Sequence, residues 1–538
     1  MIINLLFGVS LIPLYLLLFL KQKRALTILQ QNFYNQNFRY LKWIKKNAFL
    51  VVFEADAYFP FLAFGFNLEP LILILLFFSY YTLALTNDFR IFKTKFVKKP
   101  LVFTPRIKRL VLTTLVLYSI PLIYILLTFS QSLIINYYLA LGALVYVNYF
   151  VLAIANYINY PIERFIFRGF SNKAKKKLSG MTDLEVIGIT GSYGKTTTKY
   201  ILNDILNEEY KSFKTPKSYN TENGIVKTIN DNLNKFNDYF IVEMGAFKKG
   251  EIKSLTNIVN PKYGIITKIG RAHLESFKNE ENIKHTKFEL FDSIPKDGAI
   301  VLNYDDPYQK GHKGKTNAKV IYVSILSDKA DVYASNIKYA KNETSFTINF
   351  KEPKSRVKVK TKLLGEFNVY NILYAAALAN HLGVTNDGIK NSISKLVAAE
   401  NRLEIKKMND INLIDNSYNS NPIGSKNALE VLAMQKGLKV VMTPGMIELG
   451  KKHYEENNVF GKRISEVADF VILVGPKQTR PIFDGLMVSE YDVDNVYVAN
   501  DINDAFVKLN EIKDDDTYVL IENDLPDIFN EKKVKKWN

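Results

Sequence analysis

The chain has 538 residues, too many for one typical domain, so we expect two or three. It carries 71 basic and 53 acidic residues, a net charge of +18, and no cysteine, which excludes disulfides, thiolate metal sites and a cysteine nucleophile. The basic residues cluster beside apolar segments, so they indicate membrane lipid headgroups as partners and not nucleic acid.

Apolar segments dominate the chain up to about residue 160. Residues 2–20 carry no charge and are long enough to cross a bilayer. No basic segment precedes them and no small-residue cleavage site follows, so they indicate a membrane anchor and not a cleaved signal peptide. Three further apolar stretches are expected to span the membrane: 71–86, 110–128 and 133–158.

The loops between these stretches predict the topology. Residues 21–47 hold seven Lys or Arg and no acid, residues 87–109 hold eight against one Asp, and residues 162–177 hold six against one Glu. The positive-inside rule places all three in the cytoplasm. Consecutive inside loops need an even number of crossings between them, so residues 49–86 are expected to form a hairpin. We therefore expect a multi-pass protein of the cell membrane, with four to five helices. If the hairpin crosses fully there are five and the N-terminus is outside. In either case the part of the chain after these spans is expected in the cytoplasm.

Two acids, Glu54 and Asp56, fall in the first arm of this hairpin. Acids at membrane depth are costly and often functional, whereas a re-entrant or interfacial arm would leave them near water. The sequence leaves both readings open. We assign the membrane region to residues 1–160 and a basic linker, expected to touch acidic lipid heads, to residues 161–181.

From residue 182 onward, apolar strands alternate with helical stretches, the pattern of a doubly wound α/β fold. A break near residue 395 divides this part into a central domain (182–395) and a Rossmann-like C-terminal α/β domain (396–538). The expected strands are 184–189, 239–244, 263–267, 299–303, 319–323, 412–415, 439–443, 470–474 and 517–521.

The segment 188–199, Gly-Ile-Thr-Gly-Ser-Tyr-Gly-Lys-Thr-Thr-Thr-Lys, follows the first of these strands and opens a helix. Backbone N–H groups and the helix dipole make such a bend a cradle for phosphate. Lys195 adds a charge for the outer phosphates, and the Thr196 hydroxyl is placed to bind Mg²⁺. The longer P-loop pattern needs glycine at position 189, where this chain has Ile, so the match is to the shorter G-x-x-G-K-T form. A P-loop site for a nucleoside triphosphate is predicted at Gly191, Ser192, Tyr193, Gly194, Lys195, Thr196 and Thr197.

Later segments add polar side chains. Glu243 follows a buried strand and precedes a glycine, at the strand end where doubly wound sheets bind ligands, and its carboxylate can hold Mg²⁺. His273 lies in the loop after the next strand, where a lone histidine is usually structural. By spacing alone, Lys287 and Glu289 are ordinary surface charges of an amphipathic stretch.

Taken together, the order and spacing of these segments resemble the Mur ligases, ATP-dependent amide-forming enzymes of peptidoglycan precursor synthesis. The resemblance covers roughly residues 182–530, and residues 414–422 are most similar to the member that adds the D-alanyl-D-alanine dipeptide. The matching segments are 188–199, 217–224, 242–246, 256–261, 269–275, 287–289, 301–306, 365–371, 401–404 and 414–422.

The resemblance implies roles for residues of the central domain. Lys195 would bind the β- and γ-phosphates, and Thr196 and Glu243 would coordinate Mg²⁺. His273 would support a second Mg²⁺ site. Lys287 matches the family's carbamylated lysine, whose added carboxylate completes the metal coordination; an unmodified lysine would repel Mg²⁺.

Further roles follow for the nucleotide and the substrates. Asn303 and Asn371 would line the adenine side. Arg402 and Asp415 would reach the nucleotide from the C-terminal domain when the domains close, and residues 415–422 would help receive the amine. The residues assigned to the substrates are Asn220, Thr221, Asn419 and Asn421.

The implied reaction uses ATP and Mg²⁺ to turn a carboxylate into an acyl phosphate, which an amine attacks to give an amide, ADP and phosphate. The implied partners are a muropeptide-type acceptor and an amino acid or dipeptide. Soluble Mur ligases begin with a small domain for the uridine nucleotide, whereas this chain has membrane spans there. The acceptor can therefore be UDP-linked or lipid-linked.

Single residues also depart from the family pattern. Asn401 stands where a glycine commonly precedes Arg402, and Tyr193 stands where many members have Asn. Asn416 replaces an acid often found after Asp415, which we expect to alter amine selection.

Two alternatives use the same sequence differently. The first is a ligase acting on another acid, such as a poly-γ-glutamate chain; residues 418–422 favour the cell-wall version. The second is a membrane transporter or assembly factor that uses ATP as a switch. The motif residues argue against it, because a switch needs neither a carbamylated lysine nor an amine site.

Overall fold

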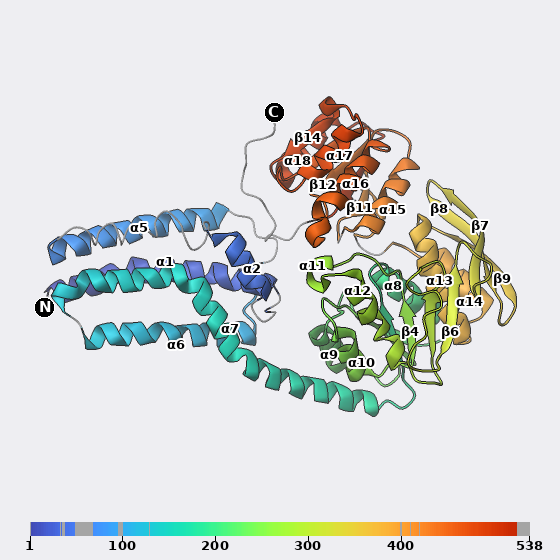
Figure 1. The fold of residues 1–538 in the computed structure, drawn as a ribbon, viewed down its shortest axis with the longest axis horizontal. Helices are drawn as coiled ribbons and strands as arrows, with labels where there is room; N and C mark the ends of the chain where they lie inside the picture. The colour runs from blue at the N-terminus through green and yellow to red at the C-terminus, as the bar shows by residue number, and fades with distance from the viewer. Residues whose placement is uncertain are drawn as a thin grey trace. The chain divides into compact units, whose positions relative to one another are not determined.

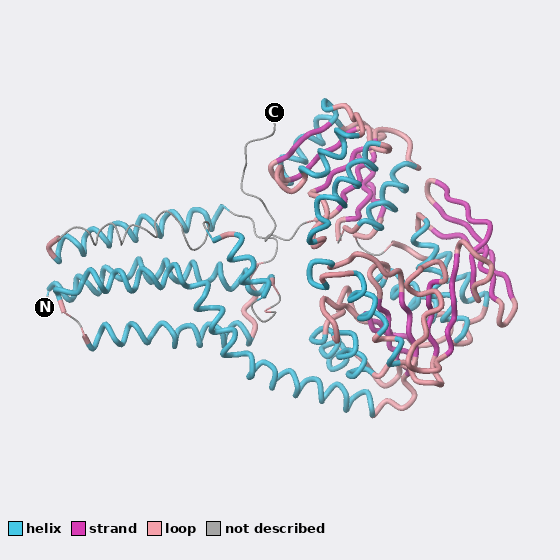
Figure 2. Tube along the Cα trace, viewed as in Figure 1, coloured by secondary structure: helices cyan, strands magenta, loops and turns pink. Residues whose placement is uncertain are grey.

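The computed structural model of the protein describes residues 2–32, 34, 38–48, 68–94, 100–128, 130–398, 401–408, 410–418 and 420–524. Glu54, Asp56 and Asn419 lie outside these residues, so nothing tests what was expected of them. The chain forms a helical unit that ends at Arg168 and an α/β unit that begins at Gly169. Figures 1 and 2 show helices alone in the first unit, and strands in the second.

Within the described residues, four helices of the first unit are long and apolar enough to cross a membrane. They are α1 (Ile2–Gln31), α5 (Pro70–Thr94), α6 (Pro105–Leu127) and α7 (Ile134–Ser179), and each corresponds to within one residue, or with extra length, to one of the four expected stretches. A short basic helix, α2 (Phe38–Lys46), lies between α1 and α5 in the sequence. The expected first arm of the hairpin falls mostly outside the described residues.

Aromatic side chains form much of the core of this unit. The Phe77 and Tyr138 rings stack with their centroids 4.3 Å apart, and Phe7 meets Tyr138 edge-on at 5.3 Å. Near the far end of α1, the buried Lys21 pairs with Asp88 of α5 at 3.6 Å. The residues expected to form a basic linker are helical, because α7 continues without a break to Ser179.

The larger sheet of the α/β unit has nine strands in the order β2-β3-β1-β4-β5-β6-β7-β8-β9. Pairing is parallel from β2 to β7 and antiparallel from β7 to β9. The strands are β1 (Glu185–Thr190), β2 (Ser212–Lys214), β3 (Tyr239–Glu243), β4 (Tyr263–Ile266), β5 (Ala299–Asn303), β6 (Lys319–Ser324), β7 (Val332–Ala340), β8 (Glu343–Phe350) and β9 (Ser355–Thr361).

Helices alternate with the parallel strands of this sheet (Figure 1). The most apolar is α13, whose central residues Ile372 to Ala379 are all buried; it packs against α8, β5, β6 and β7. The helices are α8 (Lys195–Leu206), α9 (Glu222–Asp231), α10 (Glu251–Val259), α11 (Leu274–Phe277), α12 (Glu280–Phe288), α13 (Glu366–His381) and α14 (Asn386–Lys395).

The second sheet has six strands in the order β10-β11-β15-β12-β13-β14, and all pairs except β10 with β11 are parallel. Its strands are β10 (Glu404–Met408), β11 (Ile411–Asn416), β12 (Lys439–Thr443), β13 (Phe470–Val474), β14 (Val496–Ala499) and β15 (Tyr518–Glu522). Its helices are α15 (Pro422–Ala433), α16 (His453–Ser465), α17 (Arg480–Val488) and α18 (Ile502–Ile512).

The predicted fold class is confirmed: a helical region precedes two mostly parallel α/β sheets. All nine expected strands are present, whereas β2, β7, β8, β9, β10 and β14 were not anticipated. In both sheets the parallel strands end on loops rich in polar residues, and the carboxyl edge of a doubly wound sheet is where ligands bind.

Candidate active site

The loop between β1 and α8 has the backbone of a phosphate cradle. Gly191 and Gly194 have φ angles of +146° and +82°, which side-chain-bearing residues rarely adopt. A Cβ at Gly191 would lie 2.0 Å from Thr267 Oγ1, and one at Gly194 would lie 2.4 Å from Asn371 Oδ1. Both positions therefore require glycine, and the first N–H groups of α8 stay open to an anion.

Lys195 folds back over this loop. Its Nζ donates to the carbonyl oxygens of Gly191 at 2.9 Å and Ser192 at 3.2 Å. Burial lowers the pKa of Lys195 to about 8; nearby Glu243 opposes this shift and the charge of Arg402 adds to it. The ammonium thus sits in the cradle, where it can meet the outer phosphates of a nucleotide.

Glu243, at the end of β3, is the centre of a buried polar cluster. Thr196 Oγ1 donates to its Oε2 at 2.9 Å and Asn220 Nδ2 to its Oε1 at 3.0 Å. Lys199 Nζ lies 3.0 Å from the same Oε2 and also donates to the carbonyl of Lys217. Although burial acts to raise the pKa of Glu243, the two lysines and Asn220 outweigh it and lower that pKa.

Two of the proposed Mg²⁺ ligands therefore meet. A hydroxyl and a carboxylate are the hard oxygen ligands that Mg²⁺ takes, so Thr196 and Glu243 fit one such ion. In the part of the chain that the structure describes, no group of three or more His, Asp or Glu side chains could hold a metal. A second ion would need a carboxylate that His273 and unmodified Lys287 do not supply.

His273 and Lys287 share one small cavity with the phosphate loop, of about 40 Å³. The residues that line it are Gly191, Ser192, Lys195, Asn220, Gly245, Ala246, Phe247, Ala272, His273, Phe277 and Lys287. Three segments that lie far apart in the sequence thus converge on the phosphate loop. The predicted phosphate loop and the two residues assigned only by the family resemblance, His273 and Lys287, therefore line the same cavity.

Lys287, in the last turn of α12, is only 3% exposed. Burial and the charge of Lys195 lower its pKa to about 7, against the opposing effects of Glu251 and Glu289. A large share of this amine is therefore neutral near pH 7, and a neutral amine is the form that reacts with CO₂. Spacing alone had placed Lys287 on the surface, and that interpretation is wrong because α12 turns the side chain inward.

His273 is held by the C-terminal domain. Its φ of +55° puts it in the left-handed region, and its Nδ1 bonds to a carboxylate oxygen of Glu448, which has a φ of +62°. The imidazole also meets the Phe247 ring edge-on at 4.5 Å. Its other nitrogen is not used by these contacts.

The two asparagines predicted for the adenine side lie in different surroundings. Asn303 is buried at the end of β5 and donates to the Tyr374 hydroxyl at 2.9 Å. A cavity of about 330 Å³ adjoins it, lined by Tyr304, Asp305, Pro307, Lys310, Ser327 and Lys329. Asn371 instead lies against the phosphate loop, where its Oδ1 accepts from Thr198 at 3.2 Å.

In the C-terminal domain, Arg402 precedes β10 and Asp415 lies in β11, the antiparallel partner of β10. The Arg402 guanidinium stacks over the Tyr418 ring at 4.2 Å, and its charge reaches Lys195. Asp415 accepts from Ser417 at 2.6 Å and pairs with Lys406 at 3.3 Å. Arg402 is thus near the phosphate loop, whereas Asp415 is engaged within its own domain.

Two residues assigned to the substrates act as helix caps. The side chain of Thr221 accepts from the backbone N–H of Gly224 at the start of α9, and Asn421 accepts from Gly424 at the start of α15. Their sequence pattern is explained at least in part by these caps. Thr197 is half-buried in the first turn of α8.

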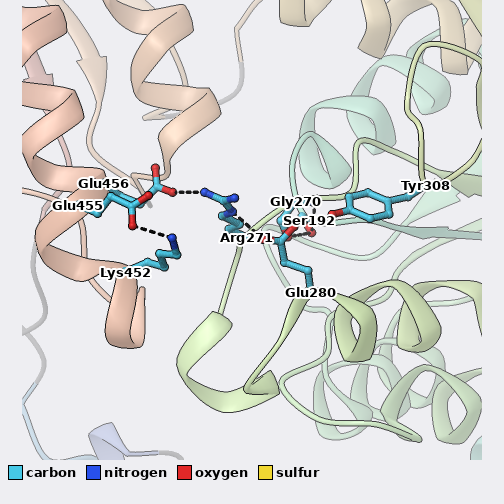
Figure 3. A network of polar contacts seen from close by, with 8 residues as sticks. All are labelled: Ser192, Gly270, Arg271, Glu280, Tyr308, Lys452, Glu455 and Glu456. Atoms are coloured by element: carbon cyan, nitrogen blue, oxygen red, sulfur yellow. Dashed lines mark hydrogen bonds and ion pairs between the residues drawn. The ribbon is translucent and has the colours of Figure 1, made fainter.

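Figure 3 shows a polar network that joins the phosphate loop to the C-terminal domain. Ser192 Oγ and Gly270 exchange hydrogen bonds of 2.9 and 3.0 Å. The next residue, Arg271, donates to Glu280 and to Glu456 of α16, both at 2.7 Å. The phosphate loop, the loop after β4 and the C-terminal domain are therefore linked through Arg271.

Sequence reasoning missed Lys199, Arg271 and Glu456 as site residues. Lys199 stood inside the quoted phosphate-loop segment, one helical turn after Lys195, and that spacing was a usable signal. Arg271 and Glu456 pair across domains, a contact that no sequence spacing reveals.

These features define a nucleotide-binding α/β protein with a phosphate loop, a carboxylate at the neighbouring strand end and a second α/β domain facing them. The Mur ligase middle domain matches residues 189–379, and the Mur ligase glutamate ligase domain matches residues 401–521. The chain belongs to the Mur ligase family, and the expected resemblance is confirmed.

Two relatives at about 30% identity are each named UDP-N-acetylmuramoyl-tripeptide--D-alanyl-D-alanine ligase. The protein of Buchnera aphidicola subsp. Baizongia pistaciae is 32% identical over 53% of this chain, and the match spans 61% of that relative. The Escherichia coli K12 protein is 30% identical over 57% of this chain and 68% of its own length.

Solved structures show the same fold. MurF from Acinetobacter baumannii superposes with a TM-score of 0.59 and 24% identity, covering 66% of this chain and 77% of that one. MurF ligase from Thermotoga maritima in complex with ADP gives the same TM-score and identity, covering 66% and 80%.

Proposed function

We propose that this protein is an ATP-dependent amide ligase of peptidoglycan precursor synthesis. It activates the carboxylate of a muropeptide as an acyl phosphate and joins it to an amino donor, for which we propose D-alanyl-D-alanine. The observation that carries the proposal is the cavity in which Lys195, Asn220, His273 and Lys287 surround the phosphate loop. The name shared by the relatives supports the choice of donor.

The residues suit the chemistry as follows. Lys195 and the N–H groups of α8 would hold the outer phosphates, and Thr196 and Glu243 would hold Mg²⁺. The metal would neutralise charge that develops on the transferred phosphoryl group. Arg402 would add positive charge from the C-terminal domain, and closure of that domain would keep water from the acyl phosphate.

The carbamate of Lys287 is part of the proposal. A buried amine whose pKa is about 7 can take up CO₂ near neutral pH, and the product is the carboxylate that the second metal position lacks. His273, whose Nδ1 is held by Glu448, lines the same cavity and would support this second metal position. Unmodified, cationic Lys287 would repel the metal, whereas carbamylated Lys287 is negatively charged and can bind it.

We further propose that the four long apolar helices anchor the protein in the cell membrane with the α/β unit in the cytoplasm. The boundaries at residues 160, 181 and 395 belong to this proposal. An anchored ligase can accept a lipid-linked muropeptide as well as a UDP-linked one, and the experiment below separates the two.

The test uses purified full-length protein in detergent with ATP, Mg²⁺, D-Ala-D-Ala and either a UDP-linked or a lipid-linked muramoyl tripeptide. We expect amine-dependent ADP release and a product heavier by the dipeptide with one of the two acceptors. Lys195→Ala should abolish both signals. Absence of ADP release with every acceptor and amine, from folded protein that still binds nucleotide, would refute the proposed function.

A further inference from the structure

A fully buried carboxylate lies behind the loop that follows β11, and the chemistry above does not use it. Glu522 ends β15 and is the register partner of Asn416 at the end of β11. Its Oε2 accepts from Asn416 Nδ2 at 2.8 Å, and its Oε1 accepts from Ser420 Oγ at 2.5 Å. Both oxygens are thus committed to the two ends of one short loop.

The backbone around this carboxylate is fixed as well. Thr443 Oγ1 donates to the carbonyl of Glu522 at 2.7 Å, and Asn523 Nδ2 donates to the carbonyl of Gly445 at 2.6 Å. The ends of β11, β12 and β15 are therefore held together at this point. Burial raises the pKa of Glu522 to about 7, although the bonds from Ser420 and Asn416 oppose that shift.

An ionised carboxylate only accepts hydrogen bonds, and this determines how its two partners are oriented. Asn416 turns its NH₂ group toward Glu522, so its carbonyl oxygen points the other way. Ser420 gives its hydroxyl hydrogen to Glu522 and keeps lone pairs for other contacts. Glu522 therefore turns two neutral side chains into acceptors, which is the polarity that an incoming ammonium or amine group requires.

The loop concerned adjoins the phosphate site. Tyr418, between the two partners of Glu522, stacks under Arg402 at 4.2 Å, and the charge of Arg402 reaches Lys195. An amine bound at this loop would therefore lie near Arg402, whose charge acts on the phosphate-loop lysine. Position 416 is Asn in this chain, and its register partner on the neighbouring strand, Glu522, provides a carboxylate next to it.

We propose that Glu522 is a positioning residue for the amino donor, which orients Asn416 and Ser420 as hydrogen-bond acceptors for its amine. The inference rests on the proposed ligase function. It adds a residue of β15 to the specificity of that reaction and explains how the chain works with asparagine at position 416.

The test measures KM for D-Ala-D-Ala and for ATP with the full-length protein at pH 8, using the acceptor on which the wild type turns over. In Glu522→Gln the side chain can accept from only one of its two partners. Either the bond from Asn416 is lost, or the Ser420 hydroxyl turns to accept from the new NH₂ group and is no longer held as an acceptor for the amine. We expect KM for the amine to rise about tenfold or more, while KM for ATP stays within about twofold. The control is Glu511→Gln, whose side chain is 59% exposed on α18, and it should change neither value.

A swapped variant separates positioning from folding. Asn416→Asp combined with Glu522→Gln moves the carboxylate across the register pair, and we expect it to restore KM for the amine to within about threefold of wild type. Unchanged amine KM in Glu522→Gln, or equal increases in both KM values, would overturn the inference while the ligase function stands. If Glu522→Gln does not fold, Ser420→Ala and Asn416→Ala probe the same contacts, and unchanged amine KM in both would overturn it too. A wild type without amine-dependent ADP release would instead refute the proposed function.

Discussion

At Lys287, the proposal depends on a covalent modification of one residue. Its pKa, lowered to about 7 by burial and by Lys195, leaves most of the amine neutral at pH 8, whereas an ordinary lysine would be almost wholly charged. We expect activity to fall as the pH drops below 7, because the protonated amine cannot hold CO₂. Lys287→Ala should lose about 100-fold in kcat, and a short carboxylate such as acetate should restore part of it.

The direct measurement for Lys287 is a ¹³C NMR carbamate signal from protein equilibrated with ¹³C-bicarbonate. Lys315, 82% exposed, provides the matched control, and Lys315→Ala should keep both the signal and the activity. Full activity of Lys287→Ala without added carboxylate would show that the modification is not needed.

Glu522 gives a second prediction at this scale, concerning stability. Its folded-state pKa of about 7 lies above the 4.5 of an unperturbed glutamic acid, so the native state favours the protonated form. This contribution is fully present below pH 4.5 and is lost as the pH rises through 7, by roughly 3 kcal/mol at most. Glu522→Gln is neutral throughout and escapes this loss.

Thermal unfolding of wild type and Glu522→Gln at pH 5 and pH 8 measures this effect. The stability of the variant minus that of the wild type should be larger at pH 8 than at pH 5. An unchanged difference between the two pH values would mean that the carboxyl group titrates normally.

How far the sequence predicted the candidate site depended on the kind of signal. Lys195, Thr196 and Glu243 occupy fixed places relative to a strand end and a glycine bend, so the local pattern sufficed to bring them together. His273 and Lys287 were assigned by the resemblance, since local spacing indicated only structural or surface residues. The role proposed for Glu522 could not be predicted from local sequence, because it depends on the register of Glu522 with Asn416 across two strands that are about a hundred residues apart.

At the scale of elements, the strands that were predicted and those that were missed differ in burial. β3 and β5 are buried along their whole length and are recognisable as apolar runs. β9 alternates instead, with Val357 and Val359 buried between exposed basic residues, so its signal was present in the period of two and was overlooked. β2 has only three residues, too few for any pattern.

The contact between α16 and the loop after β4 gives a prediction about these elements. Arg271 bridges Glu280 and Glu456, but its side chain is 40% exposed, so solvent screens the pair. A double-mutant cycle with Arg271→Ala and Glu456→Gln, followed by thermal unfolding, should give a coupling of about 0.5–1 kcal/mol.

The comparison for this bridge is the Arg480–Asp484 pair, which lies within α17 and joins no domains. Arg480→Ala should leave KM for ATP unchanged, whereas Arg271→Ala should raise it, because Arg271 follows Gly270, which bonds to Ser192 of the phosphate loop. Additive effects of the two bridge mutations would mean that the domains are not coupled through Arg271.

For the whole molecule, the membrane topology depends on whether the number of crossings between successive basic loops is even or odd. If α1 crosses from outside to inside, the basic residues after it lie in the cytoplasm, as the positive-inside rule requires. The basic loop between α5 and α6 is then inside only if the chain crosses twice between these loops. α5 supplies one crossing, and the second would fall in residues 49–67, outside the described residues.

The absence of native cysteine allows a clean test of this parity in cells. Single cysteines at Asn4, Lys42, Lys108 and Asn237 would each be the only thiol in the chain. A membrane-impermeant maleimide should label Asn4→Cys in intact cells, and the other three only after permeabilisation. Labelling of Lys108→Cys from outside would mean an odd number of crossings between the two basic loops. Labelling of Asn4→Cys only after permeabilisation, as for the other three, would place the N-terminus inside and reduce the count to four, because α1 would then not cross. Either result would correct the predicted number of spans. Whatever that number is, protection of Asn237→Cys in intact cells would place the proposed ligase site on the side of the membrane that holds ATP.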